Sequence, residues 1–410
     1  MQKRSALVMN NFYNGLSIIQ ELGHKKVPVY ALDFERSVGT FSRFAKYYQC
    51  PNPTTHETEF VDFLYDLCLK ISDSPVIFPT NDAWAMAIAR HKEKLSEVAS
   101  PCVSDIKTIE LLLDKKLFSQ WCNKQGYPTP AVYEFGQLGS IDNIKYPLIL
   151  KPMQRRISSD NQKNLVDQNV FNKNRMILVA SYDELVKTRL VLGEYAESFL
   201  IQEFVPGLSN QMYTIGVYAN KEGVLKGIFT GRKVRGYPAD SGDCVLGQSE
   251  QMPEQFIEIV ADFCKASKYF GIAEFEFKKN SETGEYTLIE VNPRSWSWVG
   301  ITPDCDVSLP WIAYSDITEN REVELIRSNK KTGEVKFVRL TFDLLNCVFR
   351  YKRDGYQDWA MSIAAWVKSL KCKKLVIAEL NHDDVLPFFF TLVYELGSFI
   401  QYIGKKKVKQ

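Results

Sequence analysis

The chain has 410 residues, of which 45% are hydrophobic and 24% are charged, and its formal net charge is +2. This length predicts two to four structural units of ordinary globular composition, and the near-neutral charge gives no sign of a nucleic-acid partner. Nine cysteines without a C-x-x-C pair and the lack of an apolar leader predict a cytoplasmic protein, and four widely separated histidines lack zinc-type spacing.

The first hundred residues alternate strands with helices. Strands are predicted at residues 5–9, 26–33 and 76–82, and helices at residues 11–22 and 83–95. Gly23 follows the first helix as its predicted C-cap. This alternation predicts a doubly wound, parallel α/β unit over residues 1–104. The first turn lacks G-x-G-x-x-G, so the unit shows no dinucleotide-binding signature.

The central part of the chain begins with one helical pattern and continues mainly in strands. Apolar spacing from residue 104 predicts a helix that ends at Gly126, before the turn-forming segment YPTP. The buried strand YPLILKPM is followed by a polar stretch, residues 154–175, whose length is typical of functional loops. Further strands are predicted at residues 199–207, 211–220 and 223–238, and a helix is predicted at residues 253–271.

The segment IAEFEFKKNSETGEYTLIEVNPR predicts two strands joined by a turn centred near Thr283. Side chains alternate along a strand, so Glu274 and Glu276 share one face of the first strand. For the same reason Glu290 and Asn292 share one face of the second strand. The hairpin therefore places Glu276 opposite Glu290.

Two directly opposed carboxylates destabilise a strand pair, and a divalent cation between them reverses that effect. Oxygen-only ligands suit Mg²⁺, which keeps several waters and binds one or two carboxylates together with substrate phosphates. The alternative is a solvated strand face that carries ordinary glutamates.

Two lysines indicate an anion site. Lys115 lies in DKKLF, and Lys151 closes the apolar run PLIL, where burial of an ammonium group is costly unless an anion such as phosphate accompanies it. The alternative for Lys151 is a lysine that reaches water at the end of a strand. The strand IQEFVPG can offer backbone amide and carbonyl groups to an adenine ring.

With these segments in place, the chain resembles the ATP-grasp carboxylate–amine ligases, a family that includes D-aspartate ligase and predicted ATP-dependent carboligases. The resemblance runs almost from end to end. It is carried by the segments NGLSIIQELG, VPVYALD, VIFPTND, DKKLF, GYPTP, LILKP, IQEFVPG, GRKVRGYP and FEF…IEVNPRSW. The paired segment FEF…IEVNPR is the most specific of them. The segment DGYQDWAMSIAAWVKSLKCKKLVIAELNHDDVLP resembles the C-terminal extension of that family.

The resemblance implies an α/β fold in which a Rossmann-like parallel domain is followed by a two-part α+β ATP-grasp fold. The implied division is an N-terminal domain at residues 1–104, a first ATP-grasp subdomain at 105–200, a second subdomain with the metal site at 201–340, and a C-terminal extension at 341–410.

The resemblance also implies roles for single residues. Lys115 and Lys151 would contact ATP phosphates. Adenine would be held at the hinge by Gln202, Glu203 and Val205. The metal ligands would be Glu276, Glu290 and Asn292, which would bind two Mg²⁺ ions, with Mn²⁺ as the alternative ion.

Three basic residues complete the implied active site. Arg294 would face the acyl phosphate and the developing oxyanion. Lys233 and Arg235, in GRKVRG, would contact the γ-phosphate or the substrate carboxylate, and their alternative is exposure on an edge strand. The segment PMQRRISSDNQKN has no glycine where many ATP-grasp enzymes close a glycine-rich loop, and the residue that would hold ribose stays unassigned.

The implied reaction is ATP-dependent amide formation through an acyl phosphate, with release of ADP and phosphate. The partners would be a small carboxylate and an amine, such as a sugar acid and an amino acid, and the oligomeric state stays open. One alternative is another ATP-grasp enzyme, either a carboxylase or a purine-pathway ligase. The other is an ATP-binding protein without turnover, against which the complete set of Glu276, Glu290, Asn292 and Arg294 argues.

The C-terminal segment DVLPFFFTLVYELGSFIQYIGKKKVKQ is apolar and ends in lysines. Pro387, Glu395 and Gln401 make it a poor membrane-spanning helix. We expect a helix that packs on the domain with a solvated basic end. The alternative is interfacial membrane attachment, helped by the lysines between residues 405 and 409.

Overall fold

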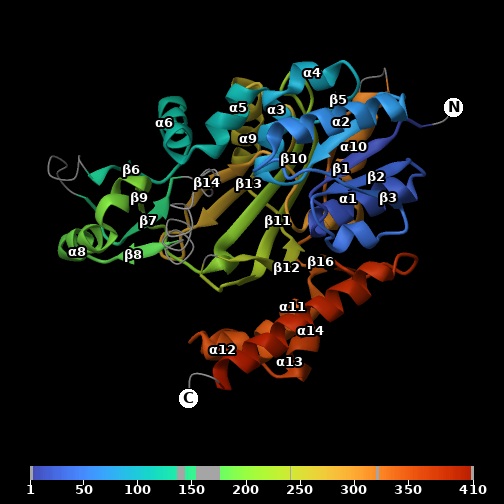
Figure 1. The fold of residues 1–410 in the computed structure, drawn as a ribbon. Helices are drawn as coiled ribbons and strands as arrows, with labels where there is room; N and C mark the ends of the chain where they lie inside the picture. The colour runs from blue at the N-terminus through green and yellow to red at the C-terminus, as the bar shows by residue number, and fades with distance from the viewer. Residues whose placement is uncertain (1–2, 136–143, 154–175, 241, 320–322, 408–410) are drawn as a thin grey trace.

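A computed structural model describes residues 3–135, 144–153, 176–240, 242–319 and 323–407. The predicted loop at residues 154–175 lies outside the described residues. Three sheets organise the described chain, and Figure 1 shows them together with their covering helices.

The first sheet is parallel and has the strand order β3-β2-β1-β4-β5. Its strands are β1 (Ala6–Met9), β2 (Val29–Asp33), β3 (Ala45–Gln49), β4 (Val76–Pro79) and β5 (Ser100–Pro101). The helices α1 (Tyr13–His24), α2 (Glu57–Ile71), α3 (Asp82–Arg90) and α4 (Lys92–Ser96) connect them. The parallel α/β unit expected from the sequence is present.

Two details of this first sheet differ from the prediction. Strand β3 was not predicted, and none of its residues is fully buried, so it lacks the continuous apolar run of its neighbours. Gly23 is not a C-cap, because it lies inside α1. A side chain at Gly23 would overlap Phe44, so the position needs glycine for close packing.

The predicted long helix is two helices, α5 (Ile106–Leu113) and α6 (Lys115–Gln125). Asp114 separates them, since its carboxylate accepts hydrogen bonds from the amides of Lys116 and Leu117, both at 2.9 Å. The predicted end is confirmed, because Gly126 adopts a left-handed conformation with φ of 77°.

The second sheet is antiparallel and small. Its order is β6-β9-β7-β8, with β6 (Val132–Tyr133), β7 (Leu148–Pro152), β8 (Ile177–Val179) and β9 (Phe199–Glu203). Helix α8 (Tyr182–Leu192) packs on it around a separate apolar core that includes Leu148, Leu185 and Phe199. Figure 1 shows this unit to one side of the molecule.

The third and largest sheet has eight strands in the order β14-β13-β10-β11-β12-β16-β17, with β15 paired to β11. The strands are β10 (Met212–Ala219), β11 (Leu225–Tyr237), β12 (Asp243–Ser249), β13 (Gly271–Lys279), β14 (Tyr286–Asn292), β15 (Ile326–Arg327), β16 (Val335–Val338) and β17 (Lys374–Ile377). Helix α9 (Glu254–Ala266) covers one face through Phe256, Val260 and Phe263. The other face shares a core with α1 and β1 of the first sheet.

Two tryptophans join the first and third sheets. Trp296 and Trp298 follow β14 and are both 1% exposed. A side chain at Gly216 would overlap the Trp296 ring, and one at Gly231 or Gly247 would overlap the Trp298 ring. The three glycines come from the neighbouring strands β10, β11 and β12, so together they form the surface on which both indoles lie.

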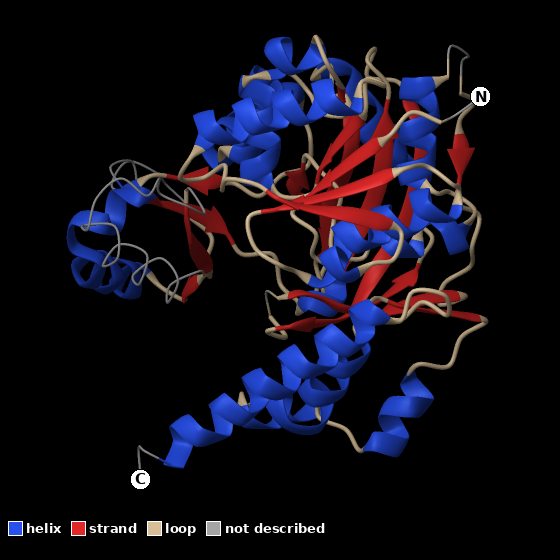
Figure 2. Ribbon diagram, turned by 45° about the vertical axis from the view of Figure 1, so that its right-hand side comes forward, coloured by secondary structure: helices blue, strands red, loops and turns tan. Residues whose placement is uncertain are grey.

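The C-terminal part is mainly helical. It contains α10 (Leu309–Thr318), α11 (Leu340–Leu345), the π-helical turn η7 (Asn346–Arg350), α12 (Tyr351–Arg353), α13 (Ile363–Ser369) and α14 (Leu386–Lys407). Short 3₁₀ turns occur at η1 (Val38–Phe41), η3 (Gly193–Ser198), η4 (Ser209–Gln211), η5 (Val299–Ile301), η6 (Pro303–Cys305) and η8 (Gln357–Trp359). Figure 2 shows the long helix α14 leading away from the sheets to the C-terminus. Within the described ranges no helix is long and apolar enough to cross a membrane.

Candidate active site

The hairpin of β13 and β14 has the predicted register. Glu276 lies opposite Glu290, and Glu274 lies opposite Asn292. A β-bulge follows Glu276, since the next pair along the ladder is Phe277 with Leu288. The cross-strand pairing of the two carboxylates is therefore confirmed, whereas the bulge was not predicted.

The local sequence fixes the turn of this hairpin. The Asn280 side-chain oxygen accepts hydrogen bonds from the amides of Glu282 at 2.8 Å and Thr283 at 3.2 Å. The Asn280 amide donates to the Glu285 carbonyl at 2.7 Å, and Gly284 takes a left-handed φ of 78°. An asparagine that caps its own turn thus sets the register that brings the acidic residues together.

Polar side chains from four neighbouring strands meet on one side of the hairpin. Lys233 Nζ of β11 donates to Glu276 Oε1 at 2.7 Å, and both side chains are 10% exposed. The Thr214 hydroxyl of β10 donates to Glu274 Oε1 at 3.0 Å. The Asn292 amide donates to Glu274 Oε2, also at 3.0 Å. The two buried carboxylates of β13 thus accept hydrogen bonds from strands on both of its sides.

The electrostatics of this cluster favour a further cation. Burial raises the pKa of Glu276, Lys233 opposes the rise, and Glu290 adds to it. Burial and the charge of Glu276 raise the pKa of Glu274. Burial alone would lower the pKa of Lys233, but Glu276 and Glu274 more than offset it, so that pKa lies above its ordinary value. The single positive charge of Lys233 does not balance the three acidic side chains around it. The cluster therefore keeps a net negative charge.

The oxygen donors of this cluster fit a hard divalent cation. Glu276, Glu290 and Asn292 offer two carboxylates and one amide, which is the donor set that Mg²⁺ takes in proteins. Over the described part of the chain, no group of three or more histidine, cysteine, aspartate or glutamate residues could hold a metal ion. A cation here would therefore complete its shell with water or substrate oxygens.

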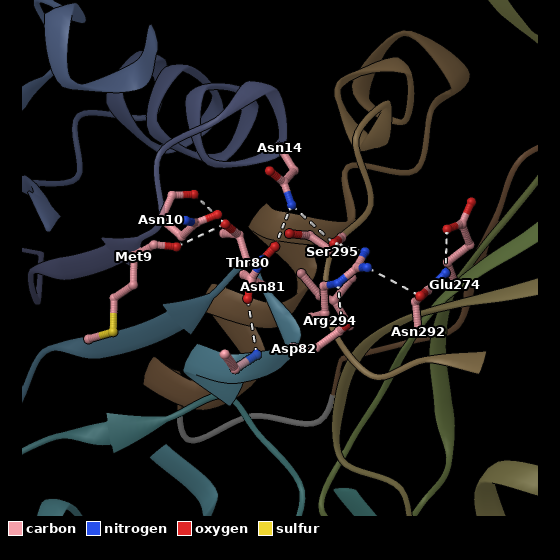
Figure 3. A network of polar contacts seen from close by, with 12 residues as sticks. Met9, Asn10, Asn14, Thr80, Asn81, Asp82, Glu274, Asn292, Arg294 and Ser295 are labelled. Carbon is pink, nitrogen blue, oxygen red and sulfur yellow. Dashed lines mark hydrogen bonds and ion pairs between the residues drawn. The ribbon is translucent and has the colours of Figure 1, made fainter. Parts of the chain in front are cut away.

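Arg294 lies just beyond β14 and connects the hairpin to the first sheet. Its Nε donates to Asp82 Oδ1 at 2.8 Å, and its Nη2 donates to Asn292 Oδ1 at 3.2 Å. Its Nη1 donates to the Ser295 carbonyl at 3.0 Å. Figure 3 shows the guanidinium between Asp82 and Asn292. Arg294 thus touches a predicted metal ligand and is fixed from the opposite side.

A second contact reinforces this junction. Asn14, in the first turn of α1, donates from its side-chain amide to the Thr80 carbonyl at 2.7 Å and to the Ser295 carbonyl at 3.2 Å. Asn14 is buried, and Figure 3 shows it between the two segments. The carboxyl end of β4 and the chain after β14 are therefore held together next to the acidic cluster.

The predicted phosphate lysines come together at the end of β7, an interior strand of the second sheet. Lys115 Nζ donates to the carbonyl of Pro152 at 2.5 Å, and Lys151 is the neighbour of Pro152 on β7. Lys278 of β13 also belongs to this region, because burial and the charge of Lys151 lower the pKa of Lys278 to about 8. Its Nζ lies 5.0 Å from the centre of the Phe204 ring. A lysine of the second sheet and a lysine of the third sheet are therefore close enough to interact electrostatically.

The predicted hinge residues lie at the end of β9. Gln202 is buried between Ile149 and Val132 of the neighbouring strands. The amide of Glu203 donates to the Ala131 carbonyl at 2.9 Å, so its donor is already used. Val205 follows at 8% exposure. These three residues therefore adjoin the strand that carries Lys151.

Arg235 does not join the acidic cluster. Its Nε and Nη2 donate to the two carboxylate oxygens of Asp343, at 2.8 and 2.5 Å, and its Nη1 donates to Ser369 Oγ at 3.1 Å. Register shifts in the pairing of β11 with β12 flank Arg235. Lys233 and Arg235 are 8% and 5% exposed on an interior strand, so the alternative of exposed residues on an edge strand is wrong.

Four residues of this region were not among the predicted site residues. They are Asp82, Thr214, Glu274 and Lys278. Glu274 carried a signal, because strand alternation placed it on the face of Glu276. Asp82 and Thr214 act through partners on other elements, and the sequence around each of them gave no sign of those contacts.

Known proteins share sequence or fold with this chain. No family model matches the chain. D-aspartate ligase of Enterococcus faecium is 24% identical over 229 residues, which are 53% of this chain and 53% of that protein. The chain therefore spans about half the length of this curated relative.

Solved structures share the fold over most of the chain. N5-carboxyaminoimidazole synthetase of Staphylococcus aureus, complexed with ADP, has a TM-score of 0.61 at 12% identity and covers 86% of this chain and 87% of its own. The biotin carboxylase domain of Hydrogenobacter thermophilus 2-oxoglutarate carboxylase, in complex with MgADP, has a TM-score of 0.60 at 16% identity, with coverage of 82% and 74%. L-amino acid ligase of Bacillus licheniformis has a TM-score of 0.52 at 14% identity, with coverage of 78% and 76%. The chain is therefore similar in sequence to a D-aspartate ligase and similar in fold to ATP-grasp enzymes.

Proposed function

We propose that the chain joins a carboxylate to an amine at the expense of ATP, through an acyl phosphate, and releases ADP and phosphate. The observation that carries the proposal is the cross-strand pair of buried Glu276 and half-buried Glu290, with Asn292 beside it and Arg294 hydrogen-bonded to Asn292. D-aspartate ligase, a relative by sequence, supports a ligase that forms an amide bond.

The nucleotide would lie between the second and third sheets. In this proposal Lys115 and Lys151 contact its phosphates, and Gln202, Glu203 and Val205 hold adenine. The amide of Glu203 already donates to Ala131, so we assign the donor to the amide of Val205. The solved complexes of similar structures with ADP and MgADP support a nucleotide in this fold.

Glu276, Glu290 and Asn292 would hold Mg²⁺, in our proposal as two ions. When bound there, Mg²⁺ neutralises the phosphate oxygens and favours attack at the γ-phosphorus. The ion pair with Lys233 fixes the position of the Glu276 carboxylate, so the site is organised before the nucleotide binds. The solved complex with MgADP supports this choice of ion.

The chemistry balances in two steps. A substrate carboxylate oxygen attacks the γ-phosphorus, and the bond from phosphorus to ADP breaks. The amine then attacks the acyl carbon, phosphate leaves with the bonding electrons, and the ammonium proton passes to phosphate or water. Arg294 would donate hydrogen bonds to the oxyanion of the tetrahedral intermediate, where preorganised donors are most effective.

A covalent cysteine intermediate has no support. Every cysteine except Cys372 is buried, and burial raises the pKa of thiols such as Cys50 and Cys102 to about 12. These thiols are therefore protonated at neutral pH and are weak nucleophiles. Positioning and charge neutralisation remain as the means of catalysis.

The division of the chain follows from this assignment. We propose an N-terminal domain at residues 1–104, two ATP-grasp subdomains at 105–200 and 201–340, and an extension at 341–410 that Arg235 anchors through Asp343. We propose that one of the two substrates is an amino acid, since the relative by sequence is a D-aspartate ligase. The cytoplasm remains our expected compartment.

The experiment is a product screen with ATP, Mg²⁺, pooled amino acids and pooled small carboxylates such as uronic acids. We expect ADP and phosphate, and a new mass equal to carboxylate plus amine minus water. Arg294→Ala should lower kcat by about 10²–10³ while ATP binds with near wild-type affinity. Stoichiometric AMP would reject the acyl-phosphate route, and ADP release that needs hydrogencarbonate but no amine would identify a carboxylase instead.

A further inference from the structure

Lys278 lies on the same face of β13 as the acidic cluster. Side chains alternate along a strand, and β13 pairs with β10 without a break in register, so Lys278 shares a face with Glu274 and Glu276. Phe277, between them, points the other way into the apolar core with α9. A strand rises about 3.3 Å per residue, so the backbone of Lys278 lies about 7 Å beyond that of Glu276. Lys278 is therefore the next side chain on this face after the proposed metal ligand.

The segment that follows β9 packs against this end of β13. Lys278 Nζ lies 5.0 Å from the centre of the Phe204 ring. The Ser281 amide, just beyond β13, donates to the Pro206 carbonyl at 3.2 Å. Phe204 belongs to the segment 202–205, which contains the residues proposed to hold adenine. The Lys278 ammonium therefore lies where the third sheet meets the proposed adenine site.

The surroundings of the Lys278 ammonium leave its charge without a direct counterion. Lys151 of β7 is close enough to repel it, and Asp240, after β11, is close enough to attract it. Among the described residues, however, no carboxylate forms an ion pair with Lys278. The Phe204 ring attracts a cation through its π face but carries no net charge. Two half-buried lysines from different sheets thus repel each other, and an anion between them would relieve that repulsion.

We propose that Lys278 binds the α-phosphate of the nucleotide, an inference that rests on the proposed nucleotide site. Metal ions in phosphoryl-transfer sites bridge the β- and γ-phosphates, and Glu276 is a proposed ligand of that metal. Adenine is proposed at the other end, beside Phe204. The α-phosphate is the anionic group between these two ends, where the Lys278 ammonium lies.

This assignment makes Lys278 a binding residue and not a catalytic one. The α-phosphate is not transferred in the proposed reaction, so its contact with Lys278 is the same before and during the chemical step. An interaction of that kind lowers KM and leaves kcat unchanged. Lys151 would reach the phosphates from the second sheet, so that lysines of both sheets enclose the phosphate chain.

The test is calorimetric titration of the full chain with ADP, AMP and adenosine in the presence of EDTA, which removes any contribution of Mg²⁺. AMP differs from adenosine only by the α-phosphate. Lys278→Met removes the charge, and Lys278→Arg keeps it. The matched control is Lys279→Met, because Lys279 is the next residue of β13 and its Nζ lies 5.4 Å from the Tyr286 ring. Strand alternation places Lys279 on the opposite face.

We expect Lys278→Met to lower the affinity for AMP by roughly 10–100-fold, the worth of one hydrogen bond to a charged group. Its affinity for adenosine should stay at the wild-type value. Lys278→Arg should keep most of the affinity for AMP, and Lys279→Met should behave like wild type. In turnover, Lys278→Met should raise KM for ATP with little change in kcat. Its melting temperature should be no lower than that of wild type, because the substitution removes repulsion from Lys151.

Wild-type affinity of Lys278→Met for AMP would overturn the assignment. An equal loss of affinity for AMP and adenosine would also overturn it, because Lys278 would then contact the base or the ribose. If Lys278→Met does not fold, the same titrations on Lys278→Gln decide the question. A wild-type chain that binds none of the three ligands would instead refute the nucleotide site, and with it the proposed function.

Discussion

Arg294 Nε donates to the Asp82 carboxylate at 2.8 Å, across a sequence separation of 212 residues. Asp82 is the first residue of α3 and lies three residues after β4 of the first sheet, and Arg294 lies two residues after the strand that carries Glu290 and Asn292. The first sheet therefore determines where this guanidinium points. A residue far from the acidic hairpin in sequence takes part in organising the proposed site.

Asp82→Asn should lower kcat by up to about 10²-fold, because misplacement of a catalytic group by about 1 Å has that effect. ATP affinity should stay near the wild-type value, since Asp82 contacts none of the proposed nucleotide residues. Parallel measurements of kcat and ATP binding check this. Asp62→Asn is the control, because Asp62 pairs with Lys94 on the surface. A variant that loses ATP binding together with kcat would contradict the positioning role.

Glu290→Gln should abolish Mg-ATP turnover without unfolding the chain. Glu290 contributes to the raised pKa of Glu276, so removing its charge relieves repulsion in the metal-free protein. The melting temperature without Mg²⁺ should therefore be no lower than that of wild type. Glu282→Gln, in the exposed turn of the same hairpin, serves as control. Wild-type turnover in Glu290→Gln would remove the basis for the metal assignment.

Lys233→Met should destabilise the metal-free protein by about 3–5 kcal/mol, the range for breaking a buried ion pair on one side. Saturating Mg²⁺ should recover part of that loss, because the ion replaces the missing positive charge. The double variant with Glu276→Gln should be more stable than Lys233→Met alone. Chemical denaturation with and without Mg²⁺ measures these differences. An additive double-mutant cycle would show that the two side chains do not interact.

Glu379→Gln should stabilise the protein at pH 8 and have little effect at pH 5. Burial raises the pKa of Glu379 from 4.5 to about 7, with Arg339 opposing and Glu395 adding to the rise. The folded state thus binds a proton that the unfolded state has lost, so wild-type stability falls as pH rises from about 4.5 to about 7.

The gain from removing this ionisation at pH 8 is at most about 3 kcal/mol by the usual conversion. Urea denaturation at both pH values checks the difference between the variants. Asp358→Asn, at an exposed acid of the same extension, is the matched control. A stability gain of Glu379→Gln that is equal at pH 5 and pH 8 would show that burial does not shift the pKa of Glu379.

Arg235→Ala should loosen the C-terminal extension and leave the proposed chemistry intact. The substitution removes the cationic partner of the buried Asp343 carboxylate, which keeps only neutral donors such as Trp366. Breaking a buried ion pair on one side typically costs about 3–5 kcal/mol. The expected result is a lower melting temperature and faster proteolysis after residue 341, with unchanged kcat per folded molecule. Arg327→Ala, at an exposed ion pair, is the matched control. A fall in kcat without loss of stability would show instead that Arg235 takes part in the active site.

The sequence alone predicted those features of the structure that depend on residues close together in the chain. Alternation along two strands and one short turn fix the register, so the pairing of Glu276 with Glu290 could be predicted from the residues alone. The parallel first sheet also followed from its apolar runs. The bulge after Glu276 could not be predicted, because strand alternation and turn residues carry no signal for it, although Phe277 and Leu288 share a buried cluster with α9 residues.

Contacts between distant segments could not be predicted. Arg235 was expected near the γ-phosphate, and no local pattern indicates Asp343 as its partner across 108 residues. The proximity of Lys278 to Lys151 likewise arises only when two sheets face each other. Asp114 divides one helical pattern into two helices, because a single capping carboxylate outweighs continuous apolar spacing.

The glycines beneath Trp296 and Trp298 have a consequence for how this chain can change over generations. A larger residue at Gly216, Gly231 or Gly247 collides with an indole, and a smaller residue in place of either tryptophan leaves a void of aromatic size. The five positions, spread over some eighty residues, are therefore coupled, because a substitution at any one of them alone destabilises the packing. These five positions should therefore change together, whereas exposed residues such as Leu190 and Val191 of α8 can vary one at a time.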